Sequence, residues 1–241
     1  MITFITALKK FKRQYEVIQN SAIYSWVSNG IKILMPDNEV LLKEMCKSYP
    51  VQFLDNVKRG RELGFNNQSP IVKDLIAKAL FHVNTPLVAF LNSDVIISED
   101  FSVKIEKIVE KYGYDIFITG NRHEVIVDKA VCSKDTYKNV WGLKKILSDK
   151  SDIFISSKFF FRKISIDMPE LIMGRLGTDD WFRWFGSNIP KHLNGTLTLP
   201  YIHCTHGHEH IKNQQDEASC KYNEGLWKGK NSISNWPLLE I

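Results

Sequence analysis

The segment Leu87-Val88-Ala89-Phe90-Leu91-Asn92-Ser93-Asp94-Val95-Ile96-Ile97 places a short polar stretch between two apolar runs. Its first five residues follow Pro86 and predict a short strand that is fully buried. A carboxylate between two such runs is costly to bury unless a cation or a metal ion accompanies it. Ligands bind at the carboxyl ends of the strands in open α/β sheets, so Asp94 is a candidate metal ligand. An aspartate that caps a turn after a strand explains the same pattern.

Segments with strand and helix periodicity alternate on both sides of this stretch. Strands are predicted at 2–8, 31–35, 51–54, 87–91, 115–119, 152–156 and 196–204. Helices are predicted at 15–27, 40–47, 71–82, 101–112 and 178–185, and Asn29-Gly30 ends the first of them. We expect an insertion or lid at 128–150 with one helix near 141–147, and an irregular stretch at 159–173. The alternation predicts a single α/β domain with a mostly parallel central sheet and helices on both faces.

The composition is that of a globular protein. The chain has 241 residues, of which 44% are hydrophobic and 24% are charged, and this length can bury a substantial core. The net charge of +5 comes from scattered lysines and arginines. It suits an anionic ligand such as a nucleotide diphosphate, or a peripheral contact with an anionic membrane surface. It does not indicate a nucleic-acid partner, because basic and aromatic residues do not alternate along one face.

The cysteines and the apolar segments indicate the compartment. Cys46, Cys132, Cys204 and Cys220 form no CxxC pair, so we expect free thiols and neither a zinc knuckle nor a disulfide framework. No apolar run approaches the roughly 18 residues of a transmembrane helix. The basic residues near the N-terminus come after an apolar segment, which is not the order of a signal peptide. These features predict a soluble, cytoplasmic protein.

Polar clusters stand at the ends of the predicted strands. Asp37-Asn38 and Asn92-Ser93-Asp94 each follow a strand, and a run of histidines follows the last strand. Asp179-Asp180 begin a helix. Strand ends of a doubly wound sheet meet in one crevice, so these clusters are candidates for a single binding site.

Basic residues in the same region are candidates for binding a diphosphate. Arg122 directly follows the predicted strand 115–119, where the crevice of the sheet is expected. Lys73, Arg59 and Arg61 lie in or near the loop before the segment 87–91. We expect at least two of these three to be solvated surface residues instead.

The histidines invite a metal interpretation. Four of the seven, His203, His206, His208 and His210, lie within eight residues, and neutral imidazole is a common metal ligand. One histidine that joins Asp94 on a divalent cation fits better than a zinc site of histidines alone, because their short gaps sit awkwardly on one strand. Solvated loop histidines are the remaining interpretation.

Asp179 and Asp180 stand in the first turn of a predicted helix, for which Thr178 is a plausible N-cap. Negative charge there is favourable on electrostatic grounds alone. The functional interpretation is a general base that takes the proton of an acceptor hydroxyl. Trp181 beside them is then either a platform for a sugar ring or a core residue.

Four segments follow one another in an order that is more specific than any one of them. They are Ile18–Trp26, Asn92–Asp94, Phe117–Arg122 and Gly174–Trp181. This order resembles that of GT-A-type glycosyltransferases. The likeness is greatest to small, family-two-like nucleotide-sugar transferases of plants and large viruses, which carry the patterns QxNAIxSW, NxD, FIxGxR and GRxGxDxW. It covers residues 1–210.

The resemblance implies a Rossmann-like GT-A fold, a nucleoside-diphosphate sugar as donor and a divalent cation, manganese or magnesium, as cofactor. Asp94 then corresponds to the metal-binding acid of the family's DxD-like motif. Asn92 replaces the first acid of that motif. His206 or His208 completes the metal shell.

The resemblance also assigns the donor-binding and catalytic residues. Asp179 falls on the family's acidic position, with Asp180 as the rival catalytic base. Thr6 and Asp37 fall where such enzymes hold the base and the ribose of the donor. The complete set of predicted donor-binding residues is Thr6, Ala7, Asp37, Lys73, Asn92, Ser93 and Arg122.

The resemblance also implies how the chain is divided into a domain and a tail. Residues 1–210 are expected to form the glycosyltransferase domain, with the nucleotide-binding half at 1–120 and the acceptor and catalytic half at 121–210. Residues 211–241 are expected to form a tail that packs on this domain.

The predicted function is metal-dependent transfer of a sugar from a nucleoside-diphosphate sugar to a hydroxyl of a glycan, lipid-linked or protein acceptor. One base without a second nucleophilic carboxylate predicts inversion. A sugar nucleotidyltransferase is a competing interpretation, although residues 6–15 contain no glycine for a phosphate-binding loop. The sequence is also compatible with a metal-dependent hydrolase that uses the histidines and with a non-catalytic nucleotide- or glycan-binding module.

Overall fold

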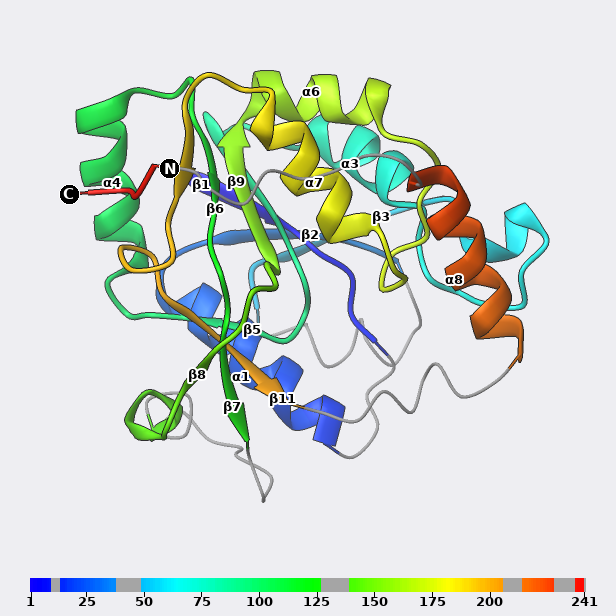
Figure 1. Ribbon diagram of the computed structural model, residues 1–241, viewed down its shortest axis with the longest axis horizontal. Coiled ribbons are helices and arrows are strands. Elements are labelled where there is room, and N and C mark those ends of the chain that lie inside the picture. Colours follow the sequence, from blue (N-terminus) through cyan, green and yellow to red (C-terminus); the bar gives the residue numbers. More distant parts are fainter. Residues whose placement is uncertain (10–13, 38–48, 127–138, 206–213, 228–236, 241) are drawn as a thin grey trace.

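The computed structural model describes residues 1–9, 14–37, 49–126, 139–205, 214–227 and 237–240. Within them, seven strands form a central sheet in the order β10-β6-β9-β4-β1-β2-β3 (Figure 1). The bounds are β1 Ile2–Ile5, β2 Lys32–Pro36, β3 Val51–Leu54, β4 Leu87–Leu91, β6 Phe117–Thr119, β9 Ile153–Ser157 and β10 His192–Asn194. Neighbouring strands are parallel, except that β9 runs antiparallel to both β4 and β6.

A smaller sheet of four strands, counted over the same residues, has the order β5-β11-β7-β8. The bounds are β5 Val95–Ile97, β7 His123–Ile126, β8 Ile146–Leu147 and β11 Tyr201–Thr205. Strand β11 pairs antiparallel with β5 and parallel with β7. The turn at 92–94, between β4 and β5, therefore joins the two sheets.

Helices cover both faces of the central sheet (Figure 1). Helices α1 (Gln14–Ser28) and α4 (Phe101–Tyr112) share a core with one face and with the small sheet. Helices α3 (Val72–Leu80), α6 (Lys158–Asp167) and α7 (Thr178–Ser187) share a core with the other face. The described chain also contains the short helices η2 (Gly60–Leu63) and η3 (Val140–Gly142) and the helix α8 (Gln214–Trp227).

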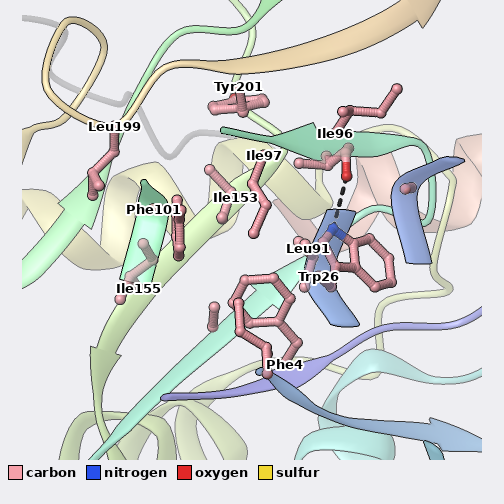
Figure 2. Close-up of a cluster of buried hydrophobic side chains, with 14 of the residues drawn as sticks. Phe4, Trp26, Leu91, Ile96, Ile97, Phe101, Ile153, Ile155, Leu199 and Tyr201 are labelled. Atoms are coloured by element: carbon pink, nitrogen blue, oxygen red, sulfur yellow. Dashed lines mark hydrogen bonds between the residues drawn. The ribbon is translucent and has the colours of Figure 1, made fainter. Parts of the chain in front are cut away.

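The core on the α1 side holds the strand that follows the turn at 92–94. Trp26 of α1 is fully buried, and its Nε1 donates a hydrogen bond of 2.8 Å to the carbonyl of Val95 (Figure 2). Its ring meets that of Phe4 edge to face, with centroids 5.8 Å apart. A buried aromatic ring with a satisfied N–H contributes strongly to a core. The first residue of β5 is thus fixed directly after Asp94.

The predicted fold class is confirmed as a mixed α/β domain with a mostly parallel central sheet and helices on both faces. The strand 51–54 and the helix 101–112 match β3 and α4 at both ends. The first helix stops at Asn29-Gly30 as predicted, with Gly30 at φ +68°. The predicted helix 40–47 lies outside the described residues, and the division of the chain at residues 120 and 210 stays a prediction.

The irregular stretch predicted at 159–173 is wrong, because most of it forms α6. The hydroxyl of Ser157 caps this helix by accepting a hydrogen bond of 3.4 Å from the N–H of Phe160. Phe161 and Ile164 are buried, whereas Phe159 is exposed. Aromatic residues on both faces of the helix concealed this amphipathic pattern.

Other local predictions are also corrected. The helix expected near 141–147 is a short turn, η3, followed by β8. Helix α7 is preceded by Gly177 at φ +90°, so glycine and not Thr178 occupies the cap position, where the absence of Cβ makes this backbone accessible. The last strand begins only at Tyr201, and residues 192–194 form the additional strand β10.

Of the helices that the structure describes, none combines the length and the apolarity that crossing a membrane requires. Cys204 and Cys220 are buried free thiols, as predicted. Cys46 and Cys132 lie outside the described residues.

Candidate active site

Asp94 is buried in the turn between β4 and β5. Its Oδ2 is 3.2 Å from Nζ of Lys9 and 3.7 Å from Nε2 of His203. Lys9 comes shortly after β1, and His203 lies on β11 opposite Val95. A buried carboxylate requires a compensating charge, and the lysine ammonium supplies one here.

Asn92 connects the same turn to β9. Its Nδ2 donates a hydrogen bond of 2.9 Å to Oδ1 of Asp152, and its backbone N–H donates one of 3.0 Å to the carbonyl of Asp152. Asp152 is buried and immediately precedes β9. The position at which the resembling enzymes have their first acid thus carries an amide, and a carboxylate from a distant part of the chain lies beside it.

Arg122 lies between two carboxylates. Its Nη1 is 3.2 and 3.1 Å from the two carboxylate oxygens of Asp152, and its Nη2 and Nε are 2.6 and 2.9 Å from Oε1 of Glu124. Burial lowers the pKa of the guanidinium, but the two acids outweigh this effect and the pKa is raised overall. The hydrogen bond from Arg122 lowers the pKa of Glu124. Arg122 therefore lies shortly after the end of β6 with a carboxylate on each side, and its role in binding a diphosphate stays a prediction.

Tyr201 of β11 completes this network. Its hydroxyl donates a hydrogen bond of 2.8 Å to the carbonyl of Gly120 and accepts one of 2.8 Å from the backbone N–H of Asp152. Burial, together with the charge of Asp152, raises the pKa of Tyr201 well above its ordinary value of 10.0. The phenol therefore stays protonated and holds Asp152 against the end of β6.

Asp179 lies in the first turn of α7 and is partly exposed. Desolvation is the main cause that raises its pKa well above the ordinary 3.8, and the negative charges of Asp152, Asp180 and Asp94 add to it. Arg122 acts in the opposite direction without cancelling this effect. The charges of acids on other elements therefore act on Asp179 at the start of α7. The roles of Asp179 as base and of Asp94 as metal ligand stay predictions.

The two tandem acids have different surroundings. Asp180 is exposed, whereas Asp179 combines a raised pKa with the absence of any salt bridge to a described residue.

Trp181 is fully buried and stacks on Phe185 with ring centroids 5.2 Å apart. Trp181 is therefore a core residue and not a platform for a sugar ring.

Three predicted donor-binding residues lie near Asp94 in the chain or at a neighbouring strand end. Thr6 and Ala7 directly follow β1, and Ser93 is buried in the turn at 92–94. The hydroxyl of Thr6 is buried and has no hydrogen-bond partner within the described chain. A buried polar group of this kind is one that a bound ligand can satisfy.

Asp37 follows β2 at the same edge of the sheet and is held through its backbone. Its N–H donates a hydrogen bond of 2.9 Å to the carbonyl of Leu54, and its carbonyl accepts one of 2.5 Å from Nη2 of Arg59. Another hydrogen bond of 2.8 Å runs from Nη1 of Arg59 to the carbonyl of Gln68. The guanidinium of Arg59 therefore fastens its loop to the end of β2.

Lys73, predicted to bind a diphosphate, instead binds a backbone carbonyl group. Its Nζ donates a hydrogen bond of 2.9 Å to the carbonyl of Ile166 near the end of α6, so it links α3 to α6. The predicted metal ligands His206 and His208 lie outside the described residues, and their roles stay predictions.

The site also contains residues that the sequence did not single out: Lys9, Glu124, Asp152 and Tyr201. Asp152 and Glu124 stand at or within strands whose partners come from distant parts of the chain. The signal that points to His203 is its place at the start of the histidine run. Lys9 is the first basic residue after β1, which is the only local feature that marks it.

The described residues do not fit a divalent cation. No group of three or more His, Cys, Asp or Glu side chains in the described part of the chain is arranged to hold a metal ion. Hard cations need several oxygen ligands with available charge. Here the carboxylate of Asp94 is paired with Lys9, and that of Asp152 is paired with Arg122.

No protein-family model matches the sequence, and no curated protein sequence matches it. Solved structures do match the fold. One is S. aureus TarS 1–349 in complex with UDP-GlcNAc, with a TM-score of 0.53 and 10% identity over 97% of this chain and 68% of that chain. Another is GalNAc-T7 with UDP, GalNAc and Mn²⁺, with a TM-score of 0.53 and 9% identity over 86% of this chain and 43% of that chain. At these identities the likeness establishes the fold alone, which is the GT-A-type fold.

Proposed function

We propose that this protein is a glycosyltransferase that moves a sugar from a nucleoside-diphosphate sugar to an acceptor hydroxyl. The observation that carries the proposal is Asp179, a carboxyl group with a raised pKa and no salt bridge to a described residue. The charges of Asp94, which follows β4, and of Asp152, which precedes β9, contribute to this raised pKa. Open α/β sheets bind their ligands at the carboxyl ends of their strands, which supports a site in this region.

The reaction requires one base and one leaving group. The ionised carboxylate of Asp179 takes the proton of the acceptor hydroxyl, and the acceptor oxygen forms a bond to the anomeric carbon. The bond between that carbon and the phosphate oxygen breaks, and the nucleoside diphosphate leaves with the electron pair. A raised pKa makes the carboxylate a better proton acceptor, provided that it is ionised. Asp94 and Asp152 are held by cations, which supports a single-step reaction with inversion.

The similar structures suggest which donors to test first. The TarS structure contains UDP-GlcNAc, and the GalNAc-T7 structure contains UDP and GalNAc. UDP-sugars are therefore the first donors, followed by GDP- and dTDP-sugars. The acceptor, whether glycan, lipid-linked or protein, stays a prediction, as does the cytoplasmic location.

The role of manganese or magnesium also stays a prediction. In that prediction Asp94 and one of the histidines His206 and His208 are the metal ligands. Every step of the proposed reaction uses side chains that the structure describes, so the proposal can be tested with and without added metal.

The test is a turnover assay with a panel of nucleotide sugars and mixed acceptors, in which release of nucleoside diphosphate and the mass of the glycosylated product are both measured. We expect transfer by the wild type and a large loss in Asp179→Asn. Asp115→Asn is the control, because Asp115 is exposed and precedes β6 at the opposite end of that strand from the site. Loss of turnover in Asp180→Asn but not in Asp179→Asn assigns the base to Asp180. Binding of donors without transfer to any acceptor refutes the enzymatic proposal.

A further inference from the structure

Lys9 places an ammonium group at the carboxyl ends of β1 and β4, 3.2 Å from Asp94. We propose that this ammonium is a built-in cation that binds the diphosphate of the donor, and that Asp94 positions Lys9 instead of holding a metal ion. The inference rests on the proposed function, because it names the residue that binds the donor's diphosphate. It also explains why the described acids do not fit a divalent cation.

The backbone of Lys9 is fixed in a way that is unusual for a surface lysine. Its N–H donates a hydrogen bond of 2.7 Å to Oε1 of Gln19, and its carbonyl accepts one of 3.1 Å from Nε2 of Gln19. Gln19 is buried on α1, which packs against the central sheet. A side-chain amide that pairs with both backbone groups of one residue fixes that residue's position. The start of the Lys9 side chain is therefore anchored to the core.

The end of the Lys9 side chain is also held in place. Its Nζ is 5.5 Å from the centroid of the Tyr15 ring, a distance at which a cation is attracted by the face of the ring. Asp94 attracts Nζ from a buried position. An ammonium carries three N–H donors, so it can bind a carboxylate and a phosphate oxygen together. The Lys9 side chain remains 35% exposed and is therefore accessible from solvent.

Arg122 is another cation among the described residues of this site, and its surroundings differ from those of Lys9. Its guanidinium donates to Asp152 through one edge and to Glu124 through the other. Its charge is shared by two acids, and its side chain is 12% exposed. Lys9 is the more accessible of the two cations and is the better candidate to contact an incoming diphosphate.

The inference and the metal prediction give opposite results for Asp94. If Asp94 is a metal ligand, Asp94→Asn removes the metal and abolishes metal-dependent binding. If Asp94 positions Lys9, Asp94→Asn keeps the ammonium but holds it less firmly, and EDTA-resistant binding falls by less than it does in Lys9→Met. A charge-assisted hydrogen bond to phosphate corresponds to roughly tenfold to hundredfold in affinity.

The experiment is calorimetric titration of the full chain with inorganic pyrophosphate and with UDP, in EDTA and in Mn²⁺. We expect the wild type to bind both ligands in EDTA, and Lys9→Met to bind them roughly tenfold to hundredfold more weakly. Lys9→Arg keeps the charge and should retain part of the affinity. Lys78→Met is the matched control, because Nζ of Lys78 is 3.1 Å from Asp74 and its side chain is 32% exposed.

Removing Lys9 alone leaves Asp94 buried without this partner and risks unfolding the protein. The double variant Lys9→Met, Asp94→Asn removes both charges and avoids this risk. We expect it to fold, as judged by circular dichroism, and to have lost EDTA-resistant pyrophosphate binding to the same degree as Lys9→Met. A folded double variant that binds pyrophosphate in EDTA as well as the wild type overturns the inference.

Two outcomes separate the inference from the proposed function. If binding and transfer require Mn²⁺, are lost in Asp94→Asn and are unaffected in Lys9→Met, the inference is wrong and the glycosyltransferase proposal stands. If the wild type binds no nucleoside diphosphate and transfers no sugar under either condition, both are wrong.

Discussion

Nη1 of Arg122 lies 3.2 and 3.1 Å from the two carboxylate oxygens of Asp152. The two side chains are 12% and 1% exposed. They come from segments that follow β6 and precede β9, so this contact joins two strand ends at the centre of the candidate site. Charge-assisted contacts of a guanidinium with a carboxylate combine strength with fixed geometry. The arrangement of the site therefore depends on this pair.

Arg122→Met is expected to destabilise the protein strongly. The variant leaves the buried carboxylate of Asp152 without its cation, and loss of one partner of a buried ion pair costs about 3–5 kcal/mol. For a chain of this size a loss of about 3 kcal/mol lowers Tm by roughly 6–12 °C. Urea denaturation followed by circular dichroism measures the free energy of unfolding.

Arg61→Met is the control for this measurement. Nε of Arg61 is 3.4 Å from Glu62, and the two side chains are 61% and 42% exposed. Solvent screens such a pair, so the expected change is within about 0.5 kcal/mol. Equal losses in the two arginine variants would contradict the special role of the buried pair.

Much of the sheet could be predicted because its strands are marked by local sequence. Five apolar residues before Asn92 predict β4, and the apolar run at 51–54 matches β3 at both ends. The antiparallel direction of β9 has no comparable local signal. Strand β9 pairs with β4 and β6, which lie far from it in the chain, and pairing over such distances depends on the assembled sheet.

The same difference applies to the site. Asp94 and Asp179 stand out because each is an acid at the end of an apolar strand or at the start of a helix. Asp152 does not stand out, because its role comes from Asn92 and Arg122, which are 60 and 30 residues away. Lys9 likewise gains its role from Asp94, 85 residues away. Patterns in local sequence indicate which strand ends carry chemistry, but not which side chains meet there.

Turnover is expected to fall at acid pH with a midpoint above the ordinary aspartate value of 3.8. The pKa of Asp179 is raised by desolvation and by neighbouring acids, and only the ionised carboxylate accepts a proton. Protonation therefore removes the base as the pH falls through the raised pKa. Asp179→Asn should lower kcat by roughly 10²–10⁴-fold. The measurement is the pH profile of kcat for both proteins, and an unchanged acid limb in the residual activity of Asp179→Asn would assign the limb to another group.

Asp179→Asn is also expected to stabilise the folded protein at neutral pH. Between the unfolded pKa near 3.8 and the raised folded pKa, the folded state binds more protons than the unfolded state. The free energy of unfolding of the wild type therefore falls as the pH rises through this window. Asparagine carries no charge, so the variant does not lose free energy of unfolding as the pH rises. Its Tm at neutral pH should therefore be higher than that of the wild type, by roughly 2–4 °C for each kcal/mol of unfolding free energy that the wild type loses. Below pH 3.8 the difference should disappear, and a difference that is constant with pH would contradict the assignment.

Gly186 and Gly225 lie in two helices, α7 and α8, and are expected to respond to alanine in opposite directions. A Cβ at Gly186 would lie 2.6 Å from Cδ1 of Phe117 and 2.7 Å from Cε1 of His192. These rings belong to β6 and β10, so Gly186→Ala forces α7 away from the sheet, and such overpacking costs about 1–3 kcal/mol. A Cβ at Gly225 meets no atom within 4 Å, and Gly225→Ala should add up to about 1 kcal/mol from helix propensity. Urea denaturation of both variants measures the free energy of unfolding and so shows whether each substitution stabilises or destabilises the protein.

Helix α7 also carries Asp179, so Gly186→Ala should lower turnover as well as stability, whereas Gly225→Ala should change stability alone. Stabilisation by Gly186→Ala would show that α7 does not pack this closely on the sheet.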